Sequence, residues 1–132
     1  MKKYRFVLLA VAIAAALSFF QVSHVVAGGA DTTPPTITFL TPADGAIVAP
    51  DANGWVAFKA RADDAGRITS IYLVTPGGGA TMWPRPPTAW AMIGNRWDAR
   101  GEAPGTYFAT CAARDRAGNR TEKTVRVTLV QP

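Results

Sequence analysis

The segment Trp55-Val56-Ala57-Phe58-Lys59-Ala60-Arg61-Ala62 decides the fold of this chain. Its apolar side chains recur at every second position from Val56 to Ala62, and the charged Lys59 and Arg61 lie between them. Successive side chains of a β-strand point to opposite faces of the sheet. The period of two therefore predicts a strand with one buried face and one solvated face.

Similar short segments lie on both sides of this one and are separated by turn residues such as Pro42-Ala43-Asp44-Gly45 and Gly77-Gly78-Gly79. The segment 82–87 cannot form a central strand, because its prolines lack the N–H group that a ladder requires, so an edge or a loop is expected there. Besides 55–62, strands are expected at 36–40, 46–48, 68–74, 88–93, 96–99, 106–114 and 123–130, with a turn at 63–67. The pattern predicts an all-β, immunoglobulin-like (Ig-like) β-sandwich of about seven antiparallel strands in two sheets, with no helix of any length.

The N-terminal residues predict export from the cytoplasm. Lys2, Lys3 and Arg5 precede an apolar run over 6–20, and small residues at Val25 and Ala27 fit a cleavage site. We expect a signal peptide at 1–27, a short linker at 28–33 and the sandwich domain at 34–132. The mature protein would be periplasmic or extracellular; the alternative is an uncleaved anchor, since 6–27 could just span a bilayer.

Composition excludes several classes of site. The only His is His24, inside the expected signal, and the only Cys is Cys111, so no serine or cysteine triad, His-rich zinc site or internal disulfide is available. The 14 Lys and Arg exceed the 9 Asp and Glu, but three leave with the signal and the rest are dispersed, which argues against nucleic-acid binding. We expect neither an enzyme nor a cofactor; a carboxylate pair, Asp98 with Glu102, is the enzymatic alternative.

Several motifs in order resemble the bacterial Ig-like domain family of secreted and cell-surface proteins. The resemblance covers about 33–130 and implies a non-enzymatic module that acts as a spacer, stabiliser or binding domain. The sequence departs from the family pattern between the third strand and Trp97, where a stretch rich in Trp, Pro and Gly replaces a short hairpin. The matching pieces are 34–45, Ala60-Arg61-Ala62-Asp63-Asp64, Trp97-Asp98, Pro104-Gly105-Thr106-Tyr107 and Asp115-Arg116-Ala117-Gly118-Asn119.

The candidate binding residues are Tyr72, Trp83, Trp90 and Phe108. Alternation places Tyr72, Val74 and Phe108 outward on neighbouring strands, as an apolar patch that would bind a partner or a second copy in a homodimer, unless 82–92 folds over it. We expect recognition of an unidentified protein or a cell-envelope component such as a glycan. The alternative is a carbohydrate-binding module in which Trp83 and Trp90 stack on sugars.

Other side chains are expected to be structural. Trp97 is expected in the core, Trp55 half-buried, Cys111 buried, and Tyr107 in the core or at a corner with its hydroxyl bonded to the backbone.

One acidic cluster has two interpretations. Asp63, Asp64, Asp115 and Asn119 would lie at one end of the sandwich, and their oxygens would suit a calcium-stabilised adhesion-type domain. The alternative is that each Asp caps its own turn, and no metal site is then expected.

Overall fold

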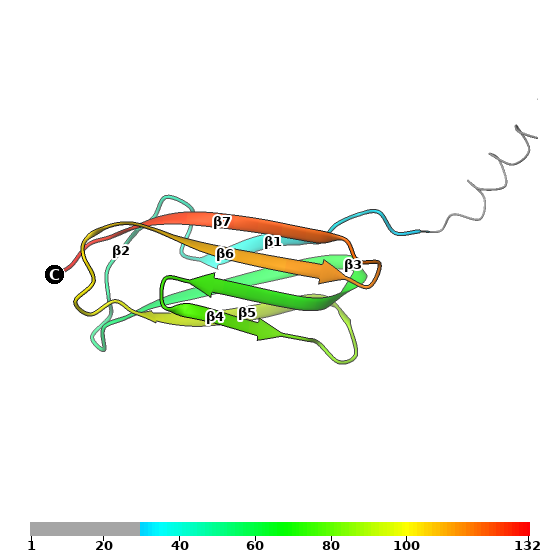
Figure 1. Ribbon diagram of the computed structural model, residues 1–132, viewed down its shortest axis with the longest axis horizontal. Helices are drawn as coiled ribbons and strands as arrows, with labels where there is room; N and C mark the ends of the chain where they lie inside the picture. The colour runs from blue at the N-terminus through cyan, green and yellow to red at the C-terminus, as the bar shows by residue number, and fades with distance from the viewer. Residues whose placement is uncertain (1–29) are drawn as a thin grey trace, which may run out of the picture. The chain divides into compact units, whose positions relative to one another are not determined.

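The computed structural model describes residues 30–132, and its compact unit Thr32–Pro132 consists of strands and turns (Figure 1). The predicted signal peptide lies outside the described residues. No helix among residues 30–132 is long and apolar enough to cross a membrane. The strands are β1 (Thr36–Thr41), β2 (Ile47–Val48), β3 (Trp55–Thr75), β4 (Gly78–Met82), β5 (Thr88–Asp98), β6 (Gly105–Asp115) and β7 (Arg120–Leu129).

Strand β3 belongs to both layers of the sandwich. Its first half, up to Asp63, pairs with β1 on one side and β5 on the other, whereas its second half, from Ile68, pairs with β4 and β6. The first layer is therefore β1-β3-β5 and the second is β4-β3-β6-β7-β2. This division, with consecutive strands exchanged between two packed layers, is that of an Ig-like β-sandwich, as predicted.

The change of layer occurs where a turn was expected between two separate strands. The pairing register shifts between Asp63 and Ile68, and Arg67 has a φ of 69°, in the left-handed region that non-glycine residues seldom adopt. The backbone N–H of Arg116 donates to the carbonyl of Arg67 over 3.0 Å, which ties the bend to the loop after β6. The residues around 64–67 thus bend one long strand rather than separating two.

The predicted alternation places one continuous core between the layers. Val56, Phe58 and Ala60 face inward from the first layer, and Leu73 and Val127 face them from the second; each is at most 5% exposed. Burial of this apolar surface contributes roughly 25 cal/mol per Å². The alternation therefore identified the inward face of the first half of β3 correctly.

Three details differ from the sequence prediction. Thr88–Asp98 is one strand instead of two, Gly78–Met82 forms an edge strand where the glycines were expected only to end one, and β2 pairs with β7 in parallel rather than antiparallel. Strand β4 was missed because Gly78-Gly79-Ala80-Thr81 carries no alternation of apolar and polar side chains.

Candidate functional site

The four residues proposed for binding lie in three places. Tyr72 and Phe108 point outward from the second layer, Trp90 points outward from the first layer, and Trp83 opens the loop between β4 and β5. The two layers turn their outer faces in opposite directions, so these side chains do not form one surface. Strand β4 lies beside β3, and β5 lies in the first layer, so 82–92 does not cover the Tyr72, Val74 and Phe108 patch.

The outer face of the second layer is mostly polar. Tyr72 is half-buried, and its hydroxyl accepts a hydrogen bond of 3.2 Å from Arg120, which also pairs with Glu122 at 2.8 Å. Phe108 is 59% exposed, but its neighbours on the same strand face are threonines, such as Thr110, whose hydroxyl shares a 2.8 Å hydrogen bond with Thr124. Phe108 and Val74, which is 44% exposed, are thus the exposed apolar side chains of an otherwise mostly polar face.

The outer face of the first layer concentrates indole and guanidinium groups. The guanidinium of Arg61 lies 4.8 Å from the ring centroid of Trp90, and that of Arg96 lies 5.1 Å from the ring centroid of Trp55. Both distances fall within the range of a cation–π interaction, which contributes about 0.5–1 kcal/mol at an exposed site. We call this surface the Trp55–Trp90 face; it comprises Trp55, Ala57, Lys59, Arg61 and Asp63 of β3 with Trp90, Met92, Gly94, Arg96 and Asp98 of β5.

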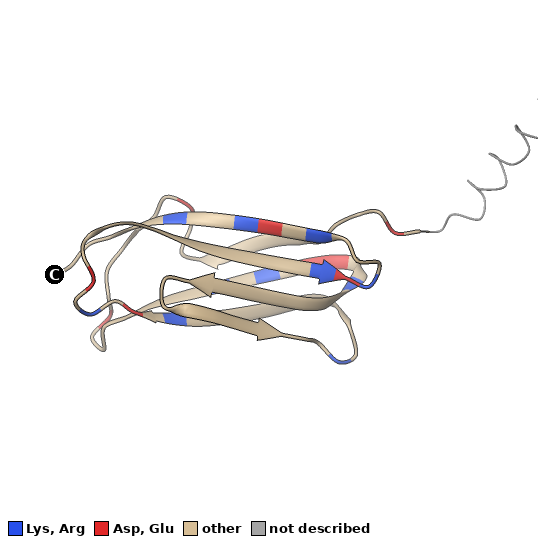
Figure 2. Cartoon of the chain, viewed as in Figure 1, with Lys and Arg blue, Asp and Glu red and all other residues tan. Residues whose placement is uncertain are grey.

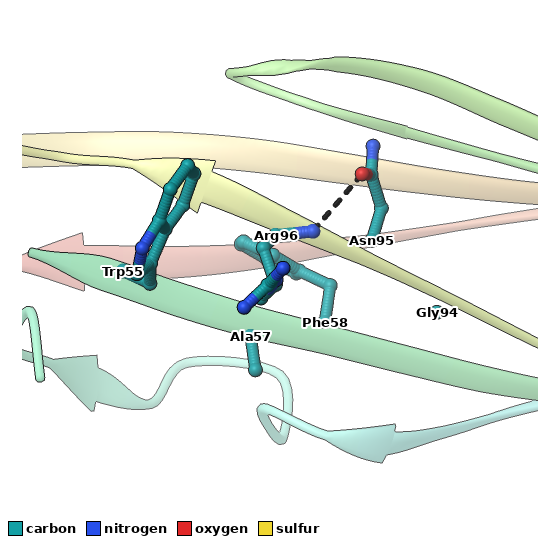
Figure 3. Close-up of a pocket in the computed structure, with 6 residues that line it drawn as sticks. All are labelled: Trp55, Ala57, Phe58, Gly94, Asn95 and Arg96. Carbon is teal, nitrogen blue, oxygen red and sulfur yellow. Dashed lines mark hydrogen bonds between the residues drawn. The ribbon is translucent and has the colours of Figure 1, made fainter. Parts of the chain in front are cut away.

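A hollow lies next to the Trp55 end of this face (Figure 3). Its volume is about 450 Å³, and Ala57 and Gly94, whose side chains are small or absent, are among the residues that line it. The side chains of Trp55 and Arg96 stand beside it. A flat strand pair thus has a depression between larger side chains, which can receive an apolar or planar group.

The charges of the Trp55–Trp90 face are partly paired. Arg61 forms an ion pair with Asp63 at 2.8 Å, and Arg100, just beyond the face, pairs with Asp98 at 2.6 Å. Lys59 and Arg96 add two further positive charges from the same strands. Figure 2 shows that Lys and Arg otherwise occur on several strands and loops, with no single basic band. The face therefore has a mild positive excess.

Asp98, one member of the carboxylate pair considered as an enzymatic alternative, is held in its charged form. Hydrogen bonds from the side chain and the backbone N–H of Arg100 lower the pKa of Asp98 to about 2. A carboxyl group that is ionised at neutral pH cannot act as a general acid there. Glu102 lies exposed in the turn between β5 and β6.

The acidic cluster divides into separate interactions. Asp63 turns to Arg61, whereas the buried Asp115 accepts hydrogen bonds of 2.9 Å from the backbone N–H and the side-chain amide of Asn119. Asp115 thus caps its own turn, as one of the two interpretations expected. Asp64 and Asp115 bring carboxylate oxygens within 4.8 Å of each other, so the calcium interpretation stays a prediction.

Three structural side chains occupy the places expected of them. Trp97 is 2% exposed and its ring centroid lies 4.6 Å from that of Tyr107, whose hydroxyl donates a 2.7 Å hydrogen bond to the carbonyl of Ala103. This is the corner tyrosine of an Ig-like sandwich. Cys111 is buried, and desolvation raises the pKa of its thiol to about 11, so it is a packing residue rather than a nucleophile.

Sequence reasoning identified Trp90 but missed its partners on the Trp55–Trp90 face. Trp55 was expected only as a half-buried residue, and Met92 and Arg96 were not singled out. The outward position of each could be read from the alternation of β3 and β5. Which of them meet depends on the register that places Ala57 opposite Arg96 and Asp63 opposite Trp90, and the sequence does not carry that register.

Comparison with known proteins gives the fold alone. No protein-family model and no curated protein sequence matches this chain. Among solved structures, the endo-beta-1,4-mannanase from Thermotoga petrophila aligns over 80% of this chain with a TM-score of 0.54 and 13% identity; the chain spans only 22% of that enzyme's length. The PKD1 domain of Vibrio anguillarum Epp aligns over 77% of this chain and 100% of its own, with a TM-score of 0.49 and 14% identity.

Proposed function

We propose that this chain is an exported, non-enzymatic Ig-like module of the bacterial cell-surface kind, and that it binds a protein of the cell envelope through the Trp55–Trp90 face. The observation that carries the proposal is the pair of indole–guanidinium contacts on one flat sheet face, Trp90 with Arg61 and Trp55 with Arg96. Trp and Arg are the side chains most enriched among residues that dominate binding energies at protein interfaces.

The chemistry of the face also indicates the kind of partner. Met92 is 41% exposed and Trp90 is 50% exposed, so a partner gains by covering them, and the hollow at Gly94 accepts one inserted side chain. Lys59 and Arg96 favour a partner with carboxylates at the rim of the contact. The expected ligand is thus a mildly acidic protein surface with a protruding apolar side chain.

The test is capture from envelope extract followed by titration of the captured protein. The variant Trp55→Ala/Arg96→Glu removes one indole and reverses one charge on the Trp55–Trp90 face, and Phe108→Ala on the opposite face is the matched control. We expect the face variant to bind the purified partner at least about tenfold more weakly, since loss of one central Trp costs about 2 kcal/mol or more. Equal binding by the face variant and wild type contradicts the proposal.

A second candidate function is carbohydrate binding through Trp83. This side chain is 63% exposed, more than any other indole that the structure describes, and it opens a loop rather than packing on a strand. An exposed ring of this kind can stack on a sugar. Oligosaccharides that change the tryptophan fluorescence of wild type, but not of Trp83→Ala, would favour this function; no response from either protein would remove it.

A further inference from the structure

Four sheet edges end the two layers, and three of them are short or covered. Strand β2 has 2 residues and β4 has 5, two of them glycine. The edge of β1 is covered from β7, because Thr121 donates to the carbonyl of Pro35 over 2.6 Å and Lys123 donates to that of Ile37 over 3.4 Å. Short strands and side-chain cover are how proteins prevent sheet edges from pairing.

Strand β5 is the longest of the four edge strands, and side chains bond to its edge groups at Trp90 and Arg96, two residues from either end. It has 11 residues, and β3 is the only strand with which it pairs in the part of the chain that the structure describes. The backbone N–H of Ala99 donates to the carbonyl of Gly54 over 2.9 Å, which fixes the phase of the β3–β5 ladder. Backbone groups alternate sides along a strand, so the odd-numbered residues of β5 bond to β3 and the even-numbered ones face the open edge.

Two side-chain contacts agree with this phase. Thr88 Oγ1 donates to the carbonyl of Trp90 over 2.5 Å, and the backbone N–H of Arg96 donates to Asn95 Oδ1 over 2.9 Å (Figure 3). A backbone group that already bonds to β3 does not need a side-chain partner on its own strand. The carbonyl of Trp90 and the N–H of Arg96 therefore face the open edge. The open edge therefore carries the N–H and C=O groups of Trp90, Met92, Gly94 and Arg96.

We propose that β5 pairs antiparallel with β5 of a second copy of this chain, about a twofold axis at Ile93. In this register Trp90 lies opposite Arg96 of the other copy, and Met92 lies opposite Gly94. The first pair joins an indole to a guanidinium, and the second joins the long side chain of Met92 to a glycine, which has no side chain. The twofold symmetry forms each pair twice. Directly opposed residues of this kind exchange both backbone hydrogen bonds, so the open groups of Met92 and Gly94 are satisfied. The carbonyl of Trp90 and the N–H of Arg96 exchange their local side-chain partners, Thr88 and Asn95, for backbone partners in the other copy.

This self-complementarity indicates that the strand that pairs with the open edge of β5 comes from a second copy of the chain. Arg96 and Trp90 of one copy attract Trp90 and Arg96 of the other, and Gly94 leaves space for Met92 on the outer face. The first layers of the two copies would join into one sheet, β1-β3-β5-β5-β3-β1. The inference goes beyond the proposed function, because it concerns the edge of the layer rather than a ligand on its face, and it differs from a homodimer through the Tyr72 and Phe108 patch.

The first test is the solution mass of the purified protein by sedimentation, over roughly micromolar to millimolar concentrations, because small interfaces are weak. Wild type should approach twice the chain mass as concentration rises. Met92→Pro should remain a monomer, because its lost N–H faces the open edge and not the β3 ladder. Met92→Ala, which keeps the N–H, is the matched control and should still form dimers.

The second test reads the register and does not depend on how well Met92→Pro folds. Met92→Cys and Gly94→Cys chains are mixed and oxidised; opposed residues lie about 5.5 Å apart between Cα atoms, within reach of a disulfide. We expect 92–94 heterodimers to exceed either homodimer, because equivalent residues lie about 7–8 Å apart. The buried Cys111 should not compete. A monomer at every concentration, or no excess of heterodimer, overturns the proposal.

Discussion

At the residue scale, the corner tyrosine supports the end of the sandwich near Trp97. Tyr107→Phe keeps the contact of the two rings but removes the hydroxyl that donates to the carbonyl of Ala103. We expect the free energy of unfolding to fall by about 1 kcal/mol, the usual net contribution of one hydrogen bond. Chemical denaturation measures it. Tyr72→Phe is the control, because its hydroxyl accepts a hydrogen bond from the exposed Arg120. An equal loss of unfolding free energy in both variants would contradict a special role for the corner tyrosine.

Asp98 makes the free energy of unfolding depend on pH in the acid range. Hydrogen bonds from Arg100 lower the pKa of the folded carboxyl from 3.8 to about 2. The charged form is thus favoured in the folded state, so this stabilisation is complete above the ordinary pKa and is lost as pH falls toward about 2. The difference in unfolding free energy between wild type and Asp98→Asn should therefore shrink between pH 5 and pH 2. It should also be small and weakened by salt, since the pair is exposed. A difference that is independent of pH would exclude this assignment.

At the scale of elements, the β3–β4 hairpin approaches Trp97 through a glycine. A Cβ at Gly77 would lie 3.1 Å from Cα and 3.1 Å from Cδ1 of Trp97, whereas a Cβ at Gly79 would meet no atom closer than 3.8 Å. Gly77→Ala should destabilise the protein by about 1–3 kcal/mol, because the hairpin or the indole must move. Gly79→Ala should be neutral or slightly stabilising. Thermal unfolding of the two variants measures the contrast, and equal melting temperatures would show that the hairpin adapts freely.

The strands that the sequence predicted well are those with a half-buried period of two. Phe58 and Ala60 were assigned to one buried face from alternation alone, because burial on one face is a local property of a strand. Strand β4 was missed because Gly78 and Gly79 have no side chains to alternate, and its position depends on pairing with β3. The continuity of β3 through Arg67 was missed for a related reason, since a bend and a turn use the same residue types.

At the scale of the whole molecule, the two outer faces of the sandwich differ in chemistry. The second layer presents threonines and the Tyr72, Arg120 and Glu122 contacts, whereas the first presents indoles, guanidiniums and the open edge of β5. Alternation predicts which side chains are outward but not which outward side chains share a face. The candidate site could therefore be predicted as single residues, such as Trp90, and not as a surface.

The shared strand β3 should make the two layers unfold together. Each layer contains one half of β3, so the chain continues from one layer into the other within a single strand, and the core cluster takes side chains from both layers, such as Phe58 and Leu73. We therefore expect two-state unfolding in denaturant. Three probes should give one midpoint: far-UV circular dichroism, the fluorescence of the buried Trp97 and the reactivity of the Cys111 thiol, which burial and a pKa of about 11 keep unreactive in the folded protein. Because Trp97 lies in the first layer and Cys111 in the second, a thiol that reacts before the fluorescence changes would mean that the β6–β7 side opens alone. In that case the bend at Arg67 would be a hinge between two units, and not the link that makes them one.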